Sequence, residues 1–175
     1  MKFSRKNFRK ATKIGKFNKL EKIYVALFFL SIAAGMIYGI FNADYYKPLE
    51  EAGRLDLQKG ENNFTIFYRN FLISLLDVVT AGVVGLYSNF ITFSAISSFF
   101  YSKGMLWAIL LVFFTYGIFE LLGALVFGLI GVNFAQRVFK LKSKLNVKGL
   151  FIIGTILLVL ASTIEYGLIL LLRAV

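Results

Sequence analysis

Three acidic side chains stand inside long apolar runs of this sequence: Asp77, Glu120 and Glu165. A charged carboxylate at the centre of a membrane costs roughly 3 kcal/mol or more, so each acid must be protonated, paired or in contact with water. Such a group can carry a proton, bind a cation or join two helices by a hydrogen bond. We therefore predict an intramembrane polar site made of these acids with Asn70 and Arg69. A purely structural hydrogen bond is an equal alternative.

The expected depth of the acids predicts where they meet. At 1.5 Å per residue, Glu120 and Glu165 lie roughly 8 to 10 Å below the expected outer ends of their helices and Asp77 about 15 Å below. The three acids are therefore expected to converge on one outward-facing pocket. Its predicted positive partners lie near membrane boundaries, from which long cationic side chains can extend inward. They are Arg69, Lys103 and Arg173.

The chemistry open to such a site is restricted by composition. The chain has no Cys and no His, which excludes a disulfide, a thiol nucleophile, a histidine-based triad and the usual zinc sites. We therefore expect no enzyme, no metal site and no cofactor. An intramembrane enzyme that works through paired carboxylates is a distant third alternative.

The same acids lie on two stripes of small and polar residues with helical spacing. From Ser74 and from Gly117 onward, both stripes advance by 3, 4, 4, 3 and 4 residues. Small residues four apart let helices approach closely in a membrane. We predict that these faces pack within one chain, and a homodimer contact is the alternative. The helix-packing residues are Ser74, Ala81, Gly85, Gly117, Ala124, Gly128 and Gly131.

The elements that must position these residues are membrane helices. Hydrophobic residues make up 58% of the 175 residues, far above a soluble domain of this length. Residues 23–41 and 150–172 are each close to the roughly 20 residues that cross a bilayer. Residues 71–100 and 105–135 are each about 30 residues long, too long for straight single spans. The sequence predicts an all-α polytopic membrane protein with one or more broken or re-entrant helices.

Charge sets the expected orientation. The first 22 residues carry nine Lys or Arg and one acid, and residues 137–148 carry five cations and no acid, so both should face the cytoplasm. Residues 1–22 then form a basic cytoplasmic segment and 23–175 one membrane domain, with an outer loop at about 42–65 and a basic loop at about 137–149. Three crossings between these two loops give about five in all. The protein is expected in the cell membrane, with its carboxyl terminus outside.

The middle crossings are predicted at residues 64–87, 90–114 and 115–136. The second is interrupted near Ser102, Lys103 and Gly104, where a re-entrant helix is the alternative because a mid-depth Lys is costly. In the outer loop, Pro48 and Gly60 suggest a short surface helix over 48–59, with a plain spacer as an equal alternative.

The basic segment has a period of three, with Lys alternating with apolar residues. On a helix such rows form adjacent cationic and apolar stripes, which suits anionic lipid headgroups, and a partner-binding arm is the alternative. No nucleic-acid partner is expected despite the net charge of +11, because the cations flank apolar runs. The membrane-surface residues are Lys10, Lys13, Lys16, Lys19 and Lys22.

Three segments resemble the stage II sporulation protein M family: 67–70 (FYRN), 80–85 (TAGVVG) and 116–121 (YGIFEL), followed by Gly128 and Gly131. Gly117 and Glu120 match the most specific of these motifs, whereas Tyr116 and Leu122 replace the His and Pro typical of members. The resemblance implies a small multispanning protein without a known active site, which acts as a scaffold for envelope partners.

Two functions follow as expectations. The first is a non-enzymatic scaffold or partner-binding subunit of a cell-envelope complex, with other membrane or envelope proteins as partners. The alternative is a small cation- or proton-coupled transporter or channel that uses the intramembrane carboxylates, because discontinuous helices commonly build transport sites.

Overall fold

The computed structural model describes residues 16–43, 62–143 and 145–174, and every regular element within them is helical. The predicted surface helix over 48–59 lies outside these residues, as do Lys10 and Lys13. The helices are α2 (Lys19–Phe41), α4 (Asn63–Val79), α5 (Val83–Ser102), α6 (Trp107–Val112), the π-helix η1 (Phe113–Gly117), α7 (Ile118–Val138) and α8 (Val147–Ala174).

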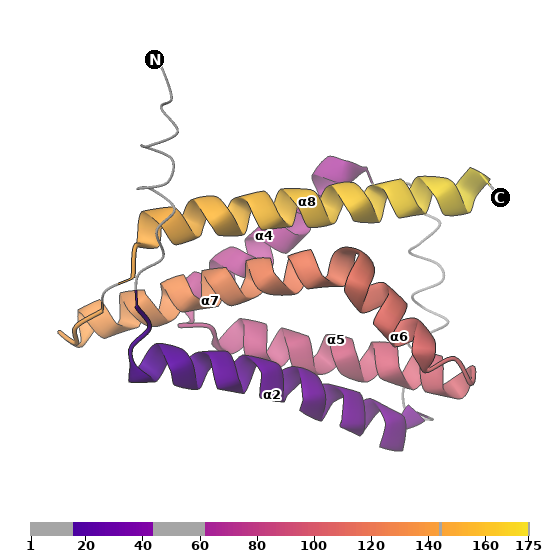
Figure 1. The fold of residues 1–175 in the computed structure, drawn as a ribbon, viewed down its shortest axis with the longest axis horizontal. Coiled ribbons are helices and arrows are strands. Elements are labelled where there is room, and N and C mark those ends of the chain that lie inside the picture. The colour runs from indigo at the N-terminus through magenta and orange to yellow at the C-terminus, as the bar shows by residue number, and fades with distance from the viewer. Residues whose placement is uncertain (1–15, 44–61, 144, 175) are drawn as a thin grey trace, which may run out of the picture.

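Four helical segments within the described residues are long and apolar enough to cross a membrane, namely 19–41, 83–102, 118–138 and 147–168. This confirms the predicted class, an all-α polytopic membrane protein. Figure 1 shows α2, α4, α5, the unit from α6 to α7, and α8 passing alternately between the two ends of the bundle. α4 takes part in this alternation although it has only 17 residues.

The predicted crossing over 64–87 is wrong, because the chain reverses at Thr80–Gly82. Ala81 (φ 52°) and Gly82 (φ 84°) both take left-handed backbone conformations, which a continuing helix does not allow. The Gly82 N–H donates to the Asp77 carbonyl (2.7 Å) and the Val83 N–H to the Thr80 carbonyl (3.2 Å). α4 and α5 are therefore two helices of a tight hairpin.

The predicted crossing over 90–114 is also wrong in its bounds. α5 ends at Ser102, and a turn containing Lys103 and Gly104 leads to α6 at the end of the bundle (Figure 1). The interruption expected at these residues is present, but it separates two passes instead of breaking one. The predicted boundary between 114 and 115 falls inside η1, where the chain bends without reversing.

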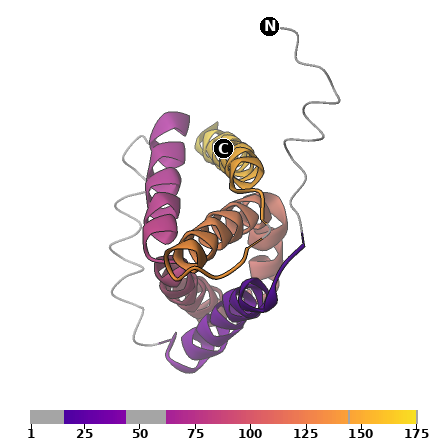
Figure 2. The same cartoon turned by 90° about the vertical axis from the view of Figure 1, so that its left-hand side faces the viewer.

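Glycines let the helices approach one another. A Cβ added to Gly35 would meet the backbone of Phe90, and one added to Gly39 would meet the backbone of Ser94, so α2 lies directly against α5. On the other side of the bundle, α4, α7 and α8 meet through Phe71, Phe127 and Phe151, whose ring centroids are 5.5 to 6.3 Å apart. Figure 2 shows α7 in the middle, with α4 and α8 on one side of it and α2 on the other.

Candidate functional site

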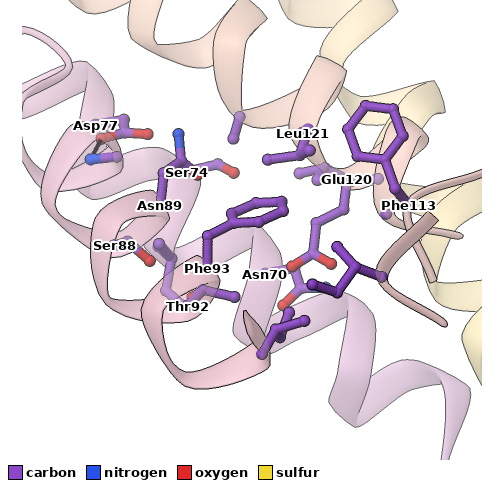
Figure 3. A pocket seen from close by; sticks show the side chains of 17 residues that line it. Asn70, Ser74, Asp77, Ser88, Asn89, Thr92, Phe93, Phe113, Glu120 and Leu121 are labelled. Carbon is purple, nitrogen blue, oxygen red and sulfur yellow. Dashed lines mark hydrogen bonds between the residues drawn. The ribbon is translucent and has the colours of Figure 1, made fainter. Parts of the chain in front are cut away.

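A cavity of about 110 Å³ lies among α4, α5, η1, α7 and α8 (Figure 3). This is room for several water molecules. Its wall includes Phe93, Phe113, Leu121 and Leu158 on the apolar side. The polar lining residues are Asn70, Ser74, Asp77, Ser88, Asn89, Thr92 and Glu120.

The two predicted stripes form much of this wall. The first stripe does not run along one helix, because the hairpin at Thr80–Gly82 folds it back on itself. Its α4 half and its α5 half therefore face each other across the cavity. The second stripe contributes Gly117 from η1 and Glu120 and Ala124 from α7 to the cavity wall.

The glycines of the stripes also lie in helix contacts within the chain. A Cβ on Gly85 would meet the Asp77 carboxyl group, and one on Gly128 would meet the Tyr24 ring. One on Gly131 would meet the backbone of Asp77 and Val78 at the hairpin. Each of these glycines thus faces another part of the same chain, and Ala81 forms the hairpin turn itself.

Asp77 caps the first turn of α5. The Gly85 N–H donates to Asp77 Oδ1, and the Val84 N–H donates to the Thr80 hydroxyl (3.3 Å). The first N–H groups of a helix have no partner within that helix, and a carboxylate there is also favoured by the helix dipole. Because lipid offers no hydrogen-bond partner, a turn within a membrane needs such internal acceptors. Asp77 therefore helps to hold the hairpin together.

Three buried polar atoms around the cavity have no hydrogen-bond partner among the residues that the structure describes: Asp77 Oδ2, Asn70 Nδ2 and Asn89 Nδ2. Asp77 is fully buried, and Asn70 and Asn89 are 6% and 7% exposed. An unsatisfied buried polar group costs about 1–3 kcal/mol. These atoms include both donors and an acceptor, and they surround a space large enough for water. The cavity wall therefore offers two donors and one acceptor that no described residue uses.

Glu120 lies in the first turn of α7, directly after η1. In Figure 3 its carboxyl group points toward Asn70 of α4. Phe113 and Gly117 of η1 also line the cavity. Single π-helical turns recur at functional sites in helical proteins, and here the turn immediately precedes the acid in the wall.

The predicted convergence of three acids is only partly realised. Asp77 and Glu120 line the cavity, whereas Glu165 is not among its lining residues and pairs with Arg69 (3.8 Å). Glu120 interacts electrostatically with both members of this pair. Arg69 and Asp77 are eight residues apart on α4, about 12 Å along its axis. Lys103 lies in the α5–α6 turn, and the side chain of Arg173 lies outside the described residues.

Asn89 is a polar cavity residue that neither stripe predicted. It does not belong to the 3-4-4-3-4 stripe, although it lies four residues after Gly85. A buried amide within an apolar helix is itself a signal, because such groups seek partners across helices. Among the described residues, no group of three or more metal-ligating acids is present.

Comparison of the chain with protein-family models, curated proteins and solved structures finds no match.

Proposed function

We propose that this protein is a small membrane transporter or channel for protons or a monovalent cation, with the polar cavity as its working site. The observation that carries the proposal is the cavity itself. Two helices each contribute a carboxyl group to it, and the carboxyl oxygen Asp77 Oδ2 in its wall has no hydrogen-bond partner among the described residues. The sequence predicted this function as the alternative to a membrane scaffold.

The surroundings of the cavity support this proposal. The wall is built where α4 reverses into α5 and where η1 bends into α7. Interrupted helices such as the α6–η1–α7 unit supply polar groups at membrane depth in many transporters. The Arg69–Glu165 pair lies about three helical turns from the hairpin along α4, which puts the cavity between an ion pair and a tight turn.

The proposed orientation follows the charges. Lys16, Lys19 and Lys22 lie at the start of α2, and Arg137 and the loop after it lie at the same end of the bundle (Figure 1). We place this end in the cytoplasm of the cell because cytoplasmic segments are enriched in Lys and Arg. The carboxyl terminus and the Arg69–Glu165 pair then face the outside.

The test is flux into proteoliposomes that contain the purified protein, under imposed gradients of protons, Na⁺ and K⁺ in turn. We expect flux with one of these cations, and Glu120→Gln should abolish it because a neutral amide cannot exchange a proton or balance a cation. Glu21→Gln is the matched control, since this acid lies away from the cavity and its variant should retain at least about half of the flux. Absence of flux under every gradient would contradict the proposal.

A membrane scaffold is the second candidate function. The observation that favours it is an exposed apolar stripe along α4, on which the rings of Phe64 and Tyr68 stack (6.1 Å between centroids). The stripe continues through Leu72, Leu76 and Val79. Gly117 and Ala124, predicted as helix-packing residues, line the cavity and are not part of this exposed stripe. A partner would therefore bind α4, in keeping with the resemblance to the sporulation protein M family.

Purification in mild detergent followed by intact mass measurement tests the scaffold. A stoichiometric partner that is lost in Tyr68→Ala and retained in Phe29→Ala would support it, because Phe29 is an exposed ring on a different helix, α2. A partner retained in both variants would contradict partner binding at the exposed stripe of α4.

A further inference from the structure

A buried acid lies at the opposite end of the bundle from the α5–α6 turn. Glu21, in the first turn of α2, has no exposed surface. Both of its carboxyl oxygens accept hydrogen bonds. Oε2 accepts from the Asn18 N–H (2.7 Å), and Oε1 accepts from Asn18 Nδ2 (3.2 Å) and the Ser143 hydroxyl (2.7 Å). This acid is therefore fully engaged within the protein.

The same hydrogen bonds join two segments that are far apart in the sequence. Asn18 Nδ2 also donates to Gln136 Oε1 (2.7 Å) and to the Lys142 carbonyl (3.3 Å). Asn133 donates to the Ser143 hydroxyl, which links the end of α7 to the loop after it. The start of α2 and the chain from Asn133 to Ser143 are thus fixed against each other.

The surface that results is cationic. Among the described residues of 16–22 and 133–148, Glu21 is the one acid, and it is buried. The cations of both segments are exposed. They are Lys16, Lys19, Lys22, Arg137, Lys140, Lys142 and Lys148.

Exposed apolar side chains alternate with these cations. Phe17 and Leu20 stand beside the lysines of the first segment, and Phe139 and Leu141 stand on either side of Lys140 in the second. Phe139 is 74% exposed. A surface with both features matches a phospholipid at the membrane boundary, because the cations meet the phosphate while the apolar side chains meet the acyl chains.

We propose that the start of α2 and the α7–α8 loop form one binding surface for the headgroups of anionic phospholipids, assembled by the Glu21 network. The expected lysine segment is then only half of the site, and Arg137, Lys140 and Lys142 supply the other half. Each Lys near an anionic membrane surface contributes about 1 kcal/mol, or roughly fivefold in affinity. This inference does not depend on the proposed transport function.

The first test measures how many phosphatidylglycerol molecules the full-length protein retains, by intact mass measurement from mixed phosphatidylglycerol and phosphatidylcholine nanodiscs. We expect a preference for phosphatidylglycerol that falls at least about fivefold in Lys140→Gln/Lys142→Gln. Lys103→Gln, which removes a cation at the other end of the bundle, should leave it unchanged. An unchanged preference in the double variant, or an equal loss in the control, would overturn the proposal.

A second variant separates the assembled surface from simple charge counting. Glu21→Ala makes the protein more cationic by one charge, so charge alone predicts stronger retention of phosphatidylglycerol. The assembled surface predicts weaker retention, because the two segments lose the bonds that hold them together. Unchanged or stronger retention, in protein that elutes as a single species, would overturn the role of the network.

Discussion

Glu21 and Asp77 are two fully buried acids that both cap a helix but differ in how many of their carboxyl oxygens accept hydrogen bonds. Each caps the first turn of a helix, Glu21 at α2 and Asp77 at α5. Both oxygens of Glu21 accept hydrogen bonds from the protein, whereas Asp77 leaves Oδ2 without a partner in the wall of a cavity. A buried acid whose oxygens are all satisfied needs no further partner, whereas a half-satisfied acid beside a cavity keeps an acceptor for water or a ligand.

The largest expected effect concerns the packing that holds Asp77 in place. Gly131→Leu should prevent folding, because its Cβ alone would collide with the backbone at Asp77 and Val78, which cannot move cheaply. The measurement is the yield of a single species in size-exclusion chromatography. Gly167→Leu is the control, since a Cβ at Gly167 meets no atom within 4 Å and this variant should elute like the wild type. A well-folded Gly131→Leu variant would show that the hairpin is not held against α7.

Next in size is the loss of the satisfied acid. Glu21→Ala should lower stability by at least about 2–3 kcal/mol, because each hydrogen bond to a charged group is worth roughly 1.5–3 kcal/mol and Glu21 accepts more than one. It should leave cation flux intact, since the network lies away from the cavity. The readouts are the thermal midpoint in detergent and the flux per folded protein. A variant with normal stability and reduced flux would reverse the comparison between the two acids.

The half-satisfied acid should show the opposite behaviour. In Asp77→Asn the amide oxygen can still accept from the Gly85 N–H, so stability should change by less than about 1 kcal/mol. Flux should fall at least tenfold, because the charge in the cavity wall is lost. Thermal unfolding and proteoliposome flux on the same preparation make the comparison. If flux is kept while stability collapses, Asp77 is a structural residue like Glu21.

The smallest expected effect concerns the hydroxyl of Thr80, which caps α5 at the hairpin. Thr80→Val should cost about 1 kcal/mol, because the Val84 N–H loses the hydroxyl that accepts its hydrogen bond. Thr155→Val is the control, since the Thr155 hydroxyl donates only to the carbonyl of Phe151 one turn earlier and its loss should be nearly neutral. Equal thermal midpoints for the two variants would contradict a capping role for Thr80.

Composition and charge alone predicted the class of the protein. Long apolar runs between short cationic segments indicate membrane helices, because a helix satisfies the backbone N–H and C=O groups of each run within that run. This requirement does not depend on which helices are neighbours. The interruption near Lys103 and Gly104 was predictable for the same reason, because a cation and a glycine are local obstacles to a span. Asp77 and Glu120 stood out in the sequence because an acid within an apolar run is unusual, and both line the cavity.

The tertiary structure decided the rest. The stripe from Asn70 to Thr92 has the spacing of one helix face, and the same spacing serves a hairpin whose halves face each other. Only the left-handed conformations of Ala81 and Gly82 distinguish the two. In the same way, Glu21 reads as one acid among many lysines until Ser143, 122 residues away, is seen to donate to it. Periodicity and composition act over a few residues, whereas the burial of a carboxyl group and the identity of its partners are set by contacts across the whole chain.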